Sequence, residues 1–240
     1  MKSPPRSPLL TFWLVLLLLC GSANPLRADV SGLFTYQVIG GTQVTITDYP
    51  KNAAGAVTIP AQIVGLPVTS INEYAFADCT GLTSVTIPAS VTSLGNYEFS
   101  GCTGLTSVTL PASVTSIDNS SFSGCTGLSS ITLPASVTFI GSGAFSGCTG
   151  LTSVSLPASV TYIGDRAFQS CTGLTSFAVT PGNTHFSSVD GSLYNVSGTS
   201  LLVCPGGRTG GYSIPAGVTS IGGYAFYRCT GLTRDRKSVV

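Results

Sequence analysis

The chain has 240 residues, of which only 8% are charged, and its formal net charge at pH 7 is +1. No lysine or arginine lies between Lys51 and Arg166, whereas acidic residues do occur in this span. Because a phosphate backbone is bound through clustered positive charge, the composition argues against nucleic acid as a partner.

Residues 1–28 are predicted to be a secretory signal peptide. Lys2 and Arg6 precede a short apolar run, Leu9–Cys20. A membrane-spanning helix needs about 20 apolar residues, so this run is too short to span. We therefore expect a secreted or cell-surface protein with no transmembrane segment after signal-peptide cleavage. Cys20 leaves lipid attachment as an alternative.

Residues 29–75 are predicted to form an N-terminal cap and a first, irregular coil. Apolar and polar residues alternate over residues 34–50 on both sides of Gly40-Gly41, a pattern typical of a β-hairpin. A stacked repeat protein needs such a cap, since its open end would expose core side chains and an unpaired strand edge.

A unit of 23 residues then repeats without a gap over residues 76–176. Its landmarks recur at one step: Phe76, Phe99, Phe122, Phe145 and Phe168, with Cys79, Cys102, Cys125, Cys148 and Cys171. A fixed period of about 20–29 residues is the signature of a leucine-rich solenoid. The sequence therefore predicts a stack of similar coils.

Each unit contains a Leu-Thr-Ser-Val-Thr-Ile/Leu segment that is predicted to be a strand. In the first unit Leu82, Val85 and Ile87 should face inward, while Ser84 and Thr86 face solvent. Stacked units should pair these strands in parallel, about 4.8 Å apart. The segment around the Phe and Cys is expected to form a short helical or 3-10 turn.

The unit AFADCTGLTSVTIPASVTSLG, at residues 75–95, resembles the BspA-type leucine-rich repeats of bacterial surface antigens. The resemblance covers about residues 33–233. It implies a mainly β leucine-rich repeat solenoid, and a secreted or cell-surface protein that adheres to host proteins or to other cells. It does not imply a particular partner, because members share the frame and differ in their exposed residues.

The period is interrupted over residues 177–211, which are predicted to be an inserted hairpin that turns near Ser197-Gly198 and projects from one side of the solenoid. Such insertions often mark the binding face. Residues 212–233 resume the repeat and stop in mid-coil. Residues 234–240 fit no part of the repeat and are interpreted as a non-native tail.

The cysteine ladder has two interpretations. Its spacing contains no C-x-x-C pair, so a metal site is not expected. Buried free thiols that pack as small apolar groups are the first interpretation. Disulfides between adjacent coils are the alternative, although a relaxed disulfide needs Cβ atoms about 3.8 Å apart, closer than the coil spacing.

No catalytic or cofactor-binding residue is predicted. His185 is the single histidine, and Asp190 follows it, but a Ser-His-Asp site requires a spatial arrangement that the sequence does not indicate. There is no nucleotide-binding glycine loop, because the glycines are turn residues at repeat spacing. We expect neither an enzyme nor a cofactor.

The predicted interaction surface has two parts. The first is a pair of hydroxyl columns on the concave sheet: Ser84, Thr86, Ser107, Thr109, Ser130, Thr132, Ser153 and Ser155. The second lies on and beside the insertion: Tyr162, Arg166, His185, Phe186 and Tyr194. The hydroxyls are alternatively small strand formers that only keep the surface hydrated. Tyr97 and Tyr224 are interpreted as packing residues of the Ala-Phe turns.

The sequence thus predicts a non-catalytic adhesion or interaction protein whose partner is a protein or glycan on another cell or matrix. The alternative is a structural spacer, or an accessory repeat region of a longer surface protein or enzyme. A hydroxyl array that acts on ice is a further alternative, which would require a flat sheet.

Overall fold

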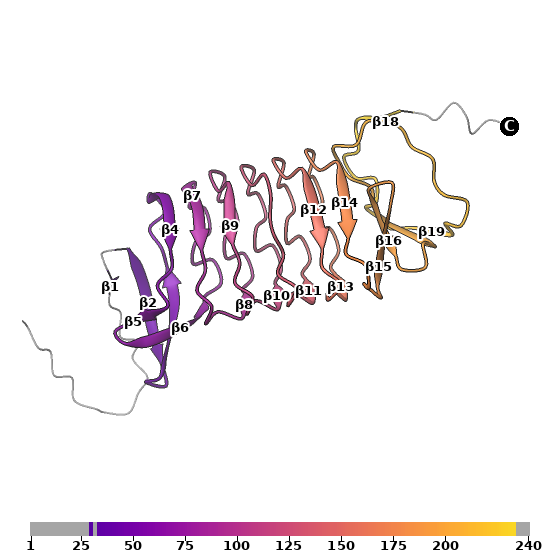
Figure 1. The fold of residues 1–240 in the computed structure, drawn as a ribbon. Coiled ribbons are helices and arrows are strands. Elements are labelled where there is room, and N and C mark those ends of the chain that lie inside the picture. Colours follow the sequence, from indigo (N-terminus) through magenta and orange to yellow (C-terminus); the bar gives the residue numbers. More distant parts are fainter. Residues whose placement is uncertain (1–28, 31–32, 234–240) are drawn as a thin grey trace, which may run out of the picture.

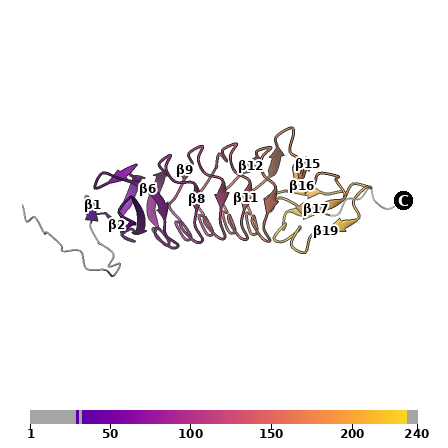
Figure 2. The same ribbon diagram turned by 90° about the horizontal axis from the view of Figure 1, so that it is seen from below.

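The computed structural model describes residues 29–30 and 33–233; the predicted signal peptide (1–28) and the predicted tail (234–240) lie outside them. In this part of the chain the coils stack in one straight row, as Figures 1 and 2 show from two directions. The described residues are strands and turns without any helix. The predicted mainly β solenoid is confirmed.

The N-terminal cap is a small mixed sheet in the order β1-β2-β3-β6-β5. Its strands are β1 (Asp29–Val30), β2 (Phe34–Ile39), β3 (Gln43–Asp48), β5 (Gln62–Ile63) and β6 (Leu66–Ile71). β2 and β3 form the predicted antiparallel hairpin. Gly40 and Gly41 sit at its tip with φ of 58° and 70°, a left-handed conformation that glycine adopts without steric cost.

Parallel strands run along two sides of the stack. The long-strand side carries β4 (Ala54–Thr58), β7 (Gly81–Thr86), β9 (Ser107–Thr109), β12 (Ser153–Leu156) and β14 (Ser176–Val179). The short-strand side carries β8 (Ser93–Leu94), β10 (Ser116–Ile117), β11 (Phe139–Ile140) and β13 (Tyr162–Ile163). Each pairs with its equivalent one coil away, for example Ser84 with Ser107, so the predicted register is confirmed.

The core between these sides is a set of columns of identical side chains. Leu82, Val85 and Ile87 are buried as predicted. The Phe99, Phe122 and Phe145 rings are fully buried and stack nearly parallel, with centroids 5.5 Å apart. Since each coil buries its apolar face only against the next coil, stability accumulates along the row.

The turn that carries the Phe and Cys is not helical, which corrects the prediction. Its N–H groups donate alternately to carbonyls of the same turn and to carbonyls of the next coil. Those of Phe99 and Gly101 donate to carbonyls of the next coil, Ser121 and Ser123, at 2.8 and 2.7 Å. Left-handed residues in each turn, such as Tyr97 (φ 54°) and Gly101 (φ 73°), interrupt any helix. We call these inter-coil bonds the turn ladder; all its N–H groups point toward the C-terminal end.

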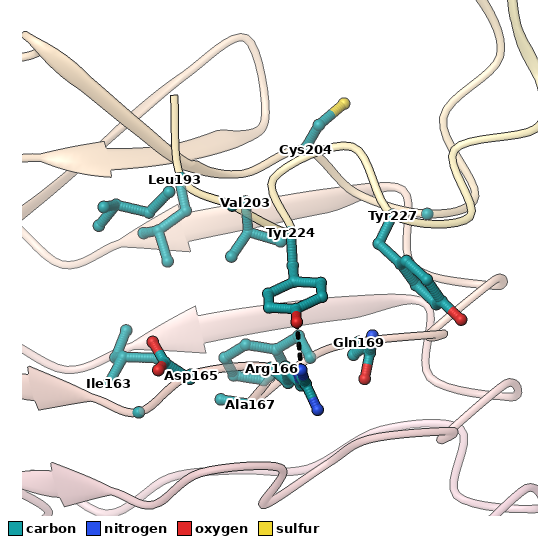
Figure 3. A pocket seen from close by; sticks show the side chains of 16 residues that line it. Ile163, Asp165, Arg166, Ala167, Gln169, Leu193, Val203, Cys204, Tyr224 and Tyr227 are labelled. Atoms are coloured by element: carbon teal, nitrogen blue, oxygen red, sulfur yellow. Dashed lines mark hydrogen bonds between the residues drawn. The ribbon is translucent and has the colours of Figure 1, made fainter. Parts of the chain in front are cut away.

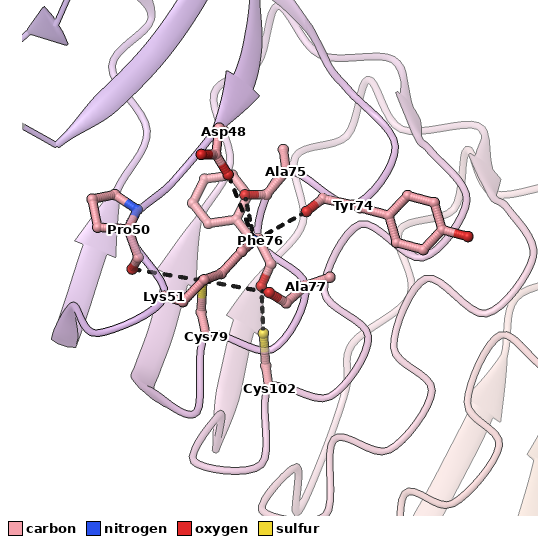
Figure 4. A network of polar contacts seen from close by, with 9 residues as sticks. All are labelled: Asp48, Pro50, Lys51, Tyr74, Ala75, Phe76, Ala77, Cys79 and Cys102. Carbon is pink, nitrogen blue, oxygen red and sulfur yellow. Dashed lines mark hydrogen bonds and ion pairs between the residues drawn. The ribbon is translucent and has the colours of Figure 1, made fainter.

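Because the turn ladder is polar, its N-terminal end presents carbonyls that need donors. The cap supplies them. The Tyr49 N–H donates to the Ala75 carbonyl at 2.9 Å, and Lys51 Nζ lies 3.3 and 3.4 Å from the carbonyl oxygens of Tyr74 and Ala75. Figure 4 shows Lys51 over this end of the stack, held also by Asp48.

The insertion is more than one hairpin. Its strands are β15 (Phe186–Val189), β16 (Ser192–Asn195) and β17 (Ser200–Val203), joined by antiparallel pairs, and β17 then pairs in parallel with β19 (Ser220–Ile221). β18 (Gly210–Gly211) and β20 (Leu232–Thr233) form the last parallel pair. The insertion was expected to project from the solenoid. Instead, Leu201 of β17 is buried and β17 pairs in parallel with β19, so β17 is part of the stack. The regular register also continues through β14 to Val179, beyond the predicted break at Phe177.

Candidate interaction surface

The predicted hydroxyl columns do face solvent along the long-strand side. Ser84 is half-buried, and the other members are exposed: Thr86, Ser107, Thr109, Ser130, Thr132, Ser153 and Ser155. Ser130 and Thr132 lie in a stretch with no assigned strand, so the sheet there is divided. The columns offer small hydroxyls without an aromatic or charged anchor, and their role in binding stays a prediction.

The predicted residues of the insertion do not form one site. His185 is exposed, with its Nδ1 3.0 Å from Thr184 Oγ1, and Phe186 is half-buried. Tyr194 is only 1% exposed, and its hydroxyl lies 2.7 Å from that of Tyr212. Tyr194 is therefore a core residue, which corrects its assignment to the interaction surface. Three consecutive residues of β16, Ser192, Leu193 and Tyr194, are buried, so both faces of this strand are covered.

The residues that a Ser-His-Asp site would need are not brought together. The Asp190 carboxylate binds the Arg208 guanidinium rather than His185. Among the described residues, no group of three His, Cys, Asp or Glu side chains is placed to hold a metal ion.

The cysteine ladder consists of free thiols in the described chain. From the second regular coil on, the Sγ donates to the carbonyl of the Phe in the preceding coil, as Cys102 does to Phe76 at 3.1 Å (Figure 4). Burial raises the pKa of Cys102 and of Cys171 to about 12. A thiol that stays protonated is a poor nucleophile and metal ligand, so these cysteines pack and hydrogen-bond rather than react.

Tyr162 and Arg166 lie on two different faces. Tyr162 is 49% exposed on the short-strand side, where its ring stacks on Phe139 at 4.9 Å. Arg166 lies on the side of the stack formed by the turns that carry the Phe and Cys, which we call the turn side. Its guanidinium donates to the Tyr224 hydroxyl and lies 4.2 Å from the centre of that ring. Cation–π contact and hydrogen bond together fix Arg166 against Tyr224.

The turn side holds a hollow that the sequence analysis missed. One left-handed position in each coil carries, in order, Tyr74, Tyr97, Ser120, Gly143 and Arg166. Side-chain bulk thus falls at the third and fourth coils and rises again at the fifth. The result is an open trough of about 840 Å³ between Tyr97 at one end and Arg166 with Tyr224 at the other. The order of residue sizes at this repeat position was the signal available in the sequence.

The lining of the trough is polar and mostly uncharged. Asn119 accepts the Ser142 N–H at 2.8 Å through its side-chain oxygen and donates to the Asn96 side-chain oxygen at 3.1 Å. Ser123, Ser146 and Gln169 complete the floor, and Asp165 and Arg166 are its charged members. Amide and hydroxyl groups both donate and accept, so this surface suits a polar ligand such as a peptide or a glycan.

A smaller and less polar cavity adjoins the trough. It has a volume of about 150 Å³ and lies between the last regular coil and the insertion. Figure 3 shows Ile163 and Ala167 on one side, Leu193 and Val203 on the other, and Tyr224 above Arg166. Asp165, Arg166, Gln169 and Tyr224 line both the trough and the cavity, so the two are continuous.

The stacked parallel strands, the 23-residue step and the inward leucines define a leucine-rich repeat solenoid. The sequence model of the BspA type leucine rich repeat region matches it in six copies, over residues 69–190 and 210–235. The chain belongs to this BspA-type leucine-rich repeat family. No curated protein matches the sequence.

Solved structures of bacterial leucine-rich repeat proteins share the fold. A leucine-rich repeat protein of T. pallidum is 28% identical, with a TM-score of 0.61 over 86% of this chain and 91% of that one. A leucine-rich cell surface protein of Faecalibacterium prausnitzii is 28% identical, with a TM-score of 0.51 over 86% and 69%. The pneumococcal vaccine antigen PcpA, at 24% identity, has a TM-score of 0.66 over 85% and 62%, which supports the fold alone.

Proposed function

We propose that this protein is a non-catalytic, cell-surface or secreted interaction protein that binds a macromolecule of another cell or matrix through the trough on its turn side. The trough carries the proposal, because it joins a polar floor to Tyr97, Arg166 and Tyr224. Tyrosine and arginine are the residue types that dominate binding energy at interfaces. The hydroxyl columns lack them.

Secretion and a surface location are parts of the same proposal. They are supported by the signal-like residues 1–28, by the family, and by the F. prausnitzii relative, which is described as a cell surface protein. In the part of the chain that the structure describes, no helix has the length and apolarity to cross a membrane. A structural spacer is the competing function, and it predicts that no single surface matters.

The test is adhesion of beads coated with the mature chain to epithelial cells, bacterial cells and immobilised matrix proteins. Ser120→Tyr fills the trough with a ring that can stack on Tyr97, as Tyr97 stacks on Tyr74 at 4.9 Å. Ser120 already has φ of 54°, like Tyr97, so the fold should accept the change. Ser130→Tyr adds the same ring to the long-strand side and is the matched control.

Ser120→Tyr should reduce adhesion about tenfold or more, since a hot-spot contact contributes about 2 kcal/mol or more. Ser130→Tyr should leave adhesion unchanged. If Ser130→Tyr alone reduces adhesion, the hydroxyl columns are the binding surface. If wild-type beads adhere to nothing in the panel, the spacer function is favoured.

A further inference from the structure

The turn ladder ends abruptly at the last regular coil. In earlier coils the Phe N–H donates to the next turn: Phe122 to the Ala144 carbonyl and Phe145 to the Ala167 carbonyl, both at 2.8 Å. The equivalent N–H of Phe168 has no acceptor among the described residues. The same holds for Arg166, whose equivalent Gly143 donates to Asp165 at 3.0 Å.

The insertion fails to cover these donors because its turn is shorter. The Leu201 carbonyl accepts the Gly222 N–H, as the Ile140 carbonyl accepts that of Gly164. The Cys204 N–H donates to the Ala225 carbonyl, as the Phe145 N–H does to Ala167. Five positions separate Ile140 from Phe145, but only three separate Leu201 from Cys204. The turn of the insertion, residues 202–203, is therefore two residues shorter than the equivalent turn, residues 141–144.

The cavity of about 150 Å³ lies where those two additional turn residues would be. Its floor is residues 163–169, which include the unmatched Arg166 and Phe168 N–H groups, and Gly223 and Tyr224 of the next coil face them. The Gly223 carbonyl, equivalent to the accepting carbonyl of Asp165, receives no N–H from the described residues. Donors on one side and an acceptor on the other thus frame the gap.

We propose that this gap binds an extended peptide segment of a partner protein, which supplies the missing rung of the turn ladder. Peptide carbonyls accept from the N–H groups of Arg166 and Phe168, and one apolar side chain enters the cavity between Ile163 and Val203. Strand-like peptide addition combines main-chain hydrogen bonds for affinity with pockets for side-chain specificity. A cavity of about 150 Å³ holds one benzene-sized group, and the apolar part of its lining, Ile163, Leu193 and Val203, suits a leucine or phenylalanine side chain.

A neutral carbonyl suits the site better than a carboxylate. The Arg166 guanidinium already binds Tyr224, and Asp165 contributes a negative charge to the same lining. Since Tyr224 is neutral, the lining holds one positive and one negative side chain, and no net charge of the lining selects an anion over an uncharged peptide carbonyl. The inference rests on the proposed function, because it names the chemistry of the partner that the trough end accepts.

The first measurement is amide hydrogen exchange on the full chain. The Phe168 N–H should exchange faster than those of Phe99, Phe122 and Phe145, which are bonded in the turn ladder. The probes are Ac-Ser-Thr-Leu-Thr-Ser-NH2 and the versions with central phenylalanine or serine. The leucine or phenylalanine peptide should slow exchange at Arg166 and Phe168 selectively, and the serine peptide should bind about tenfold more weakly.

Gly223→Leu is the test variant, since a Cβ at Gly223 meets no atom within 4 Å and the longer side chain can fill the gap. Gly217→Leu is the matched control, because that glycine is equally open and lies outside the cavity lining. Gly223→Leu should weaken peptide binding about tenfold, and Gly217→Leu should not change it.

Protection of Phe168 in the free protein equal to that of Phe145 would overturn the inference, as would millimolar peptide that leaves both amides unchanged. In the second case the gap holds water only. Cell adhesion that persists in Gly223→Leu but fails in Ser120→Tyr would refute the peptide site alone and leave the proposed function intact.

Discussion

Replacing one buried carboxyl should stabilise this protein in a pH-dependent way. Glu98 is fully buried at a turn position where other coils carry Ala75, Ala144 and Ala167. Its Oε2 accepts the Gly95 N–H at 2.7 Å, whereas Oε1 has no partner in the described chain. Burial raises the pKa of Glu98 well above its ordinary value of 4.5, although the Gly95 bond opposes the shift.

The direction of the pH effect follows from linkage. Above pH 4.5 the unfolded glutamate ionises while the folded one keeps its proton, so wild-type stability falls as pH rises toward the folded pKa. Glu98→Ala removes this loss. At pH 4 the variant loses about 0.8 kcal/mol for one buried methylene and about 1 kcal/mol for the Gly95 hydrogen bond, and it gains about 1–3 kcal/mol by removing an unpartnered oxygen, so the two proteins should be nearly equal.

Above that pH the advantage of Glu98→Ala should grow by up to about 1.4 kcal/mol per pH unit. In a domain of this size that is about 3–6 °C in melting temperature per unit. The assay is thermal unfolding by circular dichroism from pH 4 to pH 8. Glu73→Ala removes an exposed carboxylate one coil away and should give no pH-dependent gain. A Glu98→Ala difference that is constant across this range would show that folded Glu98 is ionised, and would refute the reasoning.

Three further predictions concern the core, the thiols and the insertion. Val85→Asp should lower the free energy of unfolding by about 3 kcal/mol or more, because it buries a charge at a position that is 1% exposed. Ser107→Asp is the control and should be tolerated, because Ser107 faces solvent. Chemical denaturation measures both variants. In the chain without residues 1–28, native iodoacetamide treatment at pH 8 should modify half-buried Cys229 first and spare Cys125 and Cys148, because the reagent cannot reach these buried thiols. Denaturation should expose seven free thiols to mass spectrometry; fewer would reveal disulfides. Tyr194→Phe should cost about 1 kcal/mol by breaking the buried contact with the Tyr212 hydroxyl; unchanged stability together with lost adhesion would instead restore Tyr194 to the binding surface.

The repeated unit determined the solenoid, the strand register and the core. A residue that recurs every 23 positions meets its own copy in the next coil, so the period alone predicts that Phe99 stacks between Phe76 and Phe122. The sequence also predicted the cap hairpin, because Gly40-Gly41 interrupts an alternating apolar and polar pattern. The helical turn was a wrong prediction, because the inter-coil bonds of Phe99 and Gly101 compete with helical ones.

The trough and the cavity were decided by tertiary structure. Ser120 and Gly143 follow Tyr97 at the 23-residue step, so the order of residue sizes could be read from the sequence. Only the structure shows that this position lines an open trough with Tyr224 at its far end. Tyr194 is a polar aromatic on an insertion, and only the packing of β16 buries it. The repeat pattern shows which residues align between coils. It does not show on which side of the solenoid a column of unequal side chains leaves a hollow.

The end of the turn ladder shows the same division most clearly. The sequence by itself determined that the period breaks after the fifth phenylalanine, and that a longer segment follows before Phe226. The parallel pairing of β17 with β19 decides which inter-coil hydrogen bonds this segment makes. Leu201 takes the place of Ile140 and Cys204 that of Phe145, so the turn between them is two residues shorter. Phe168, whose N–H has no acceptor among the described residues, lines the cavity at this point.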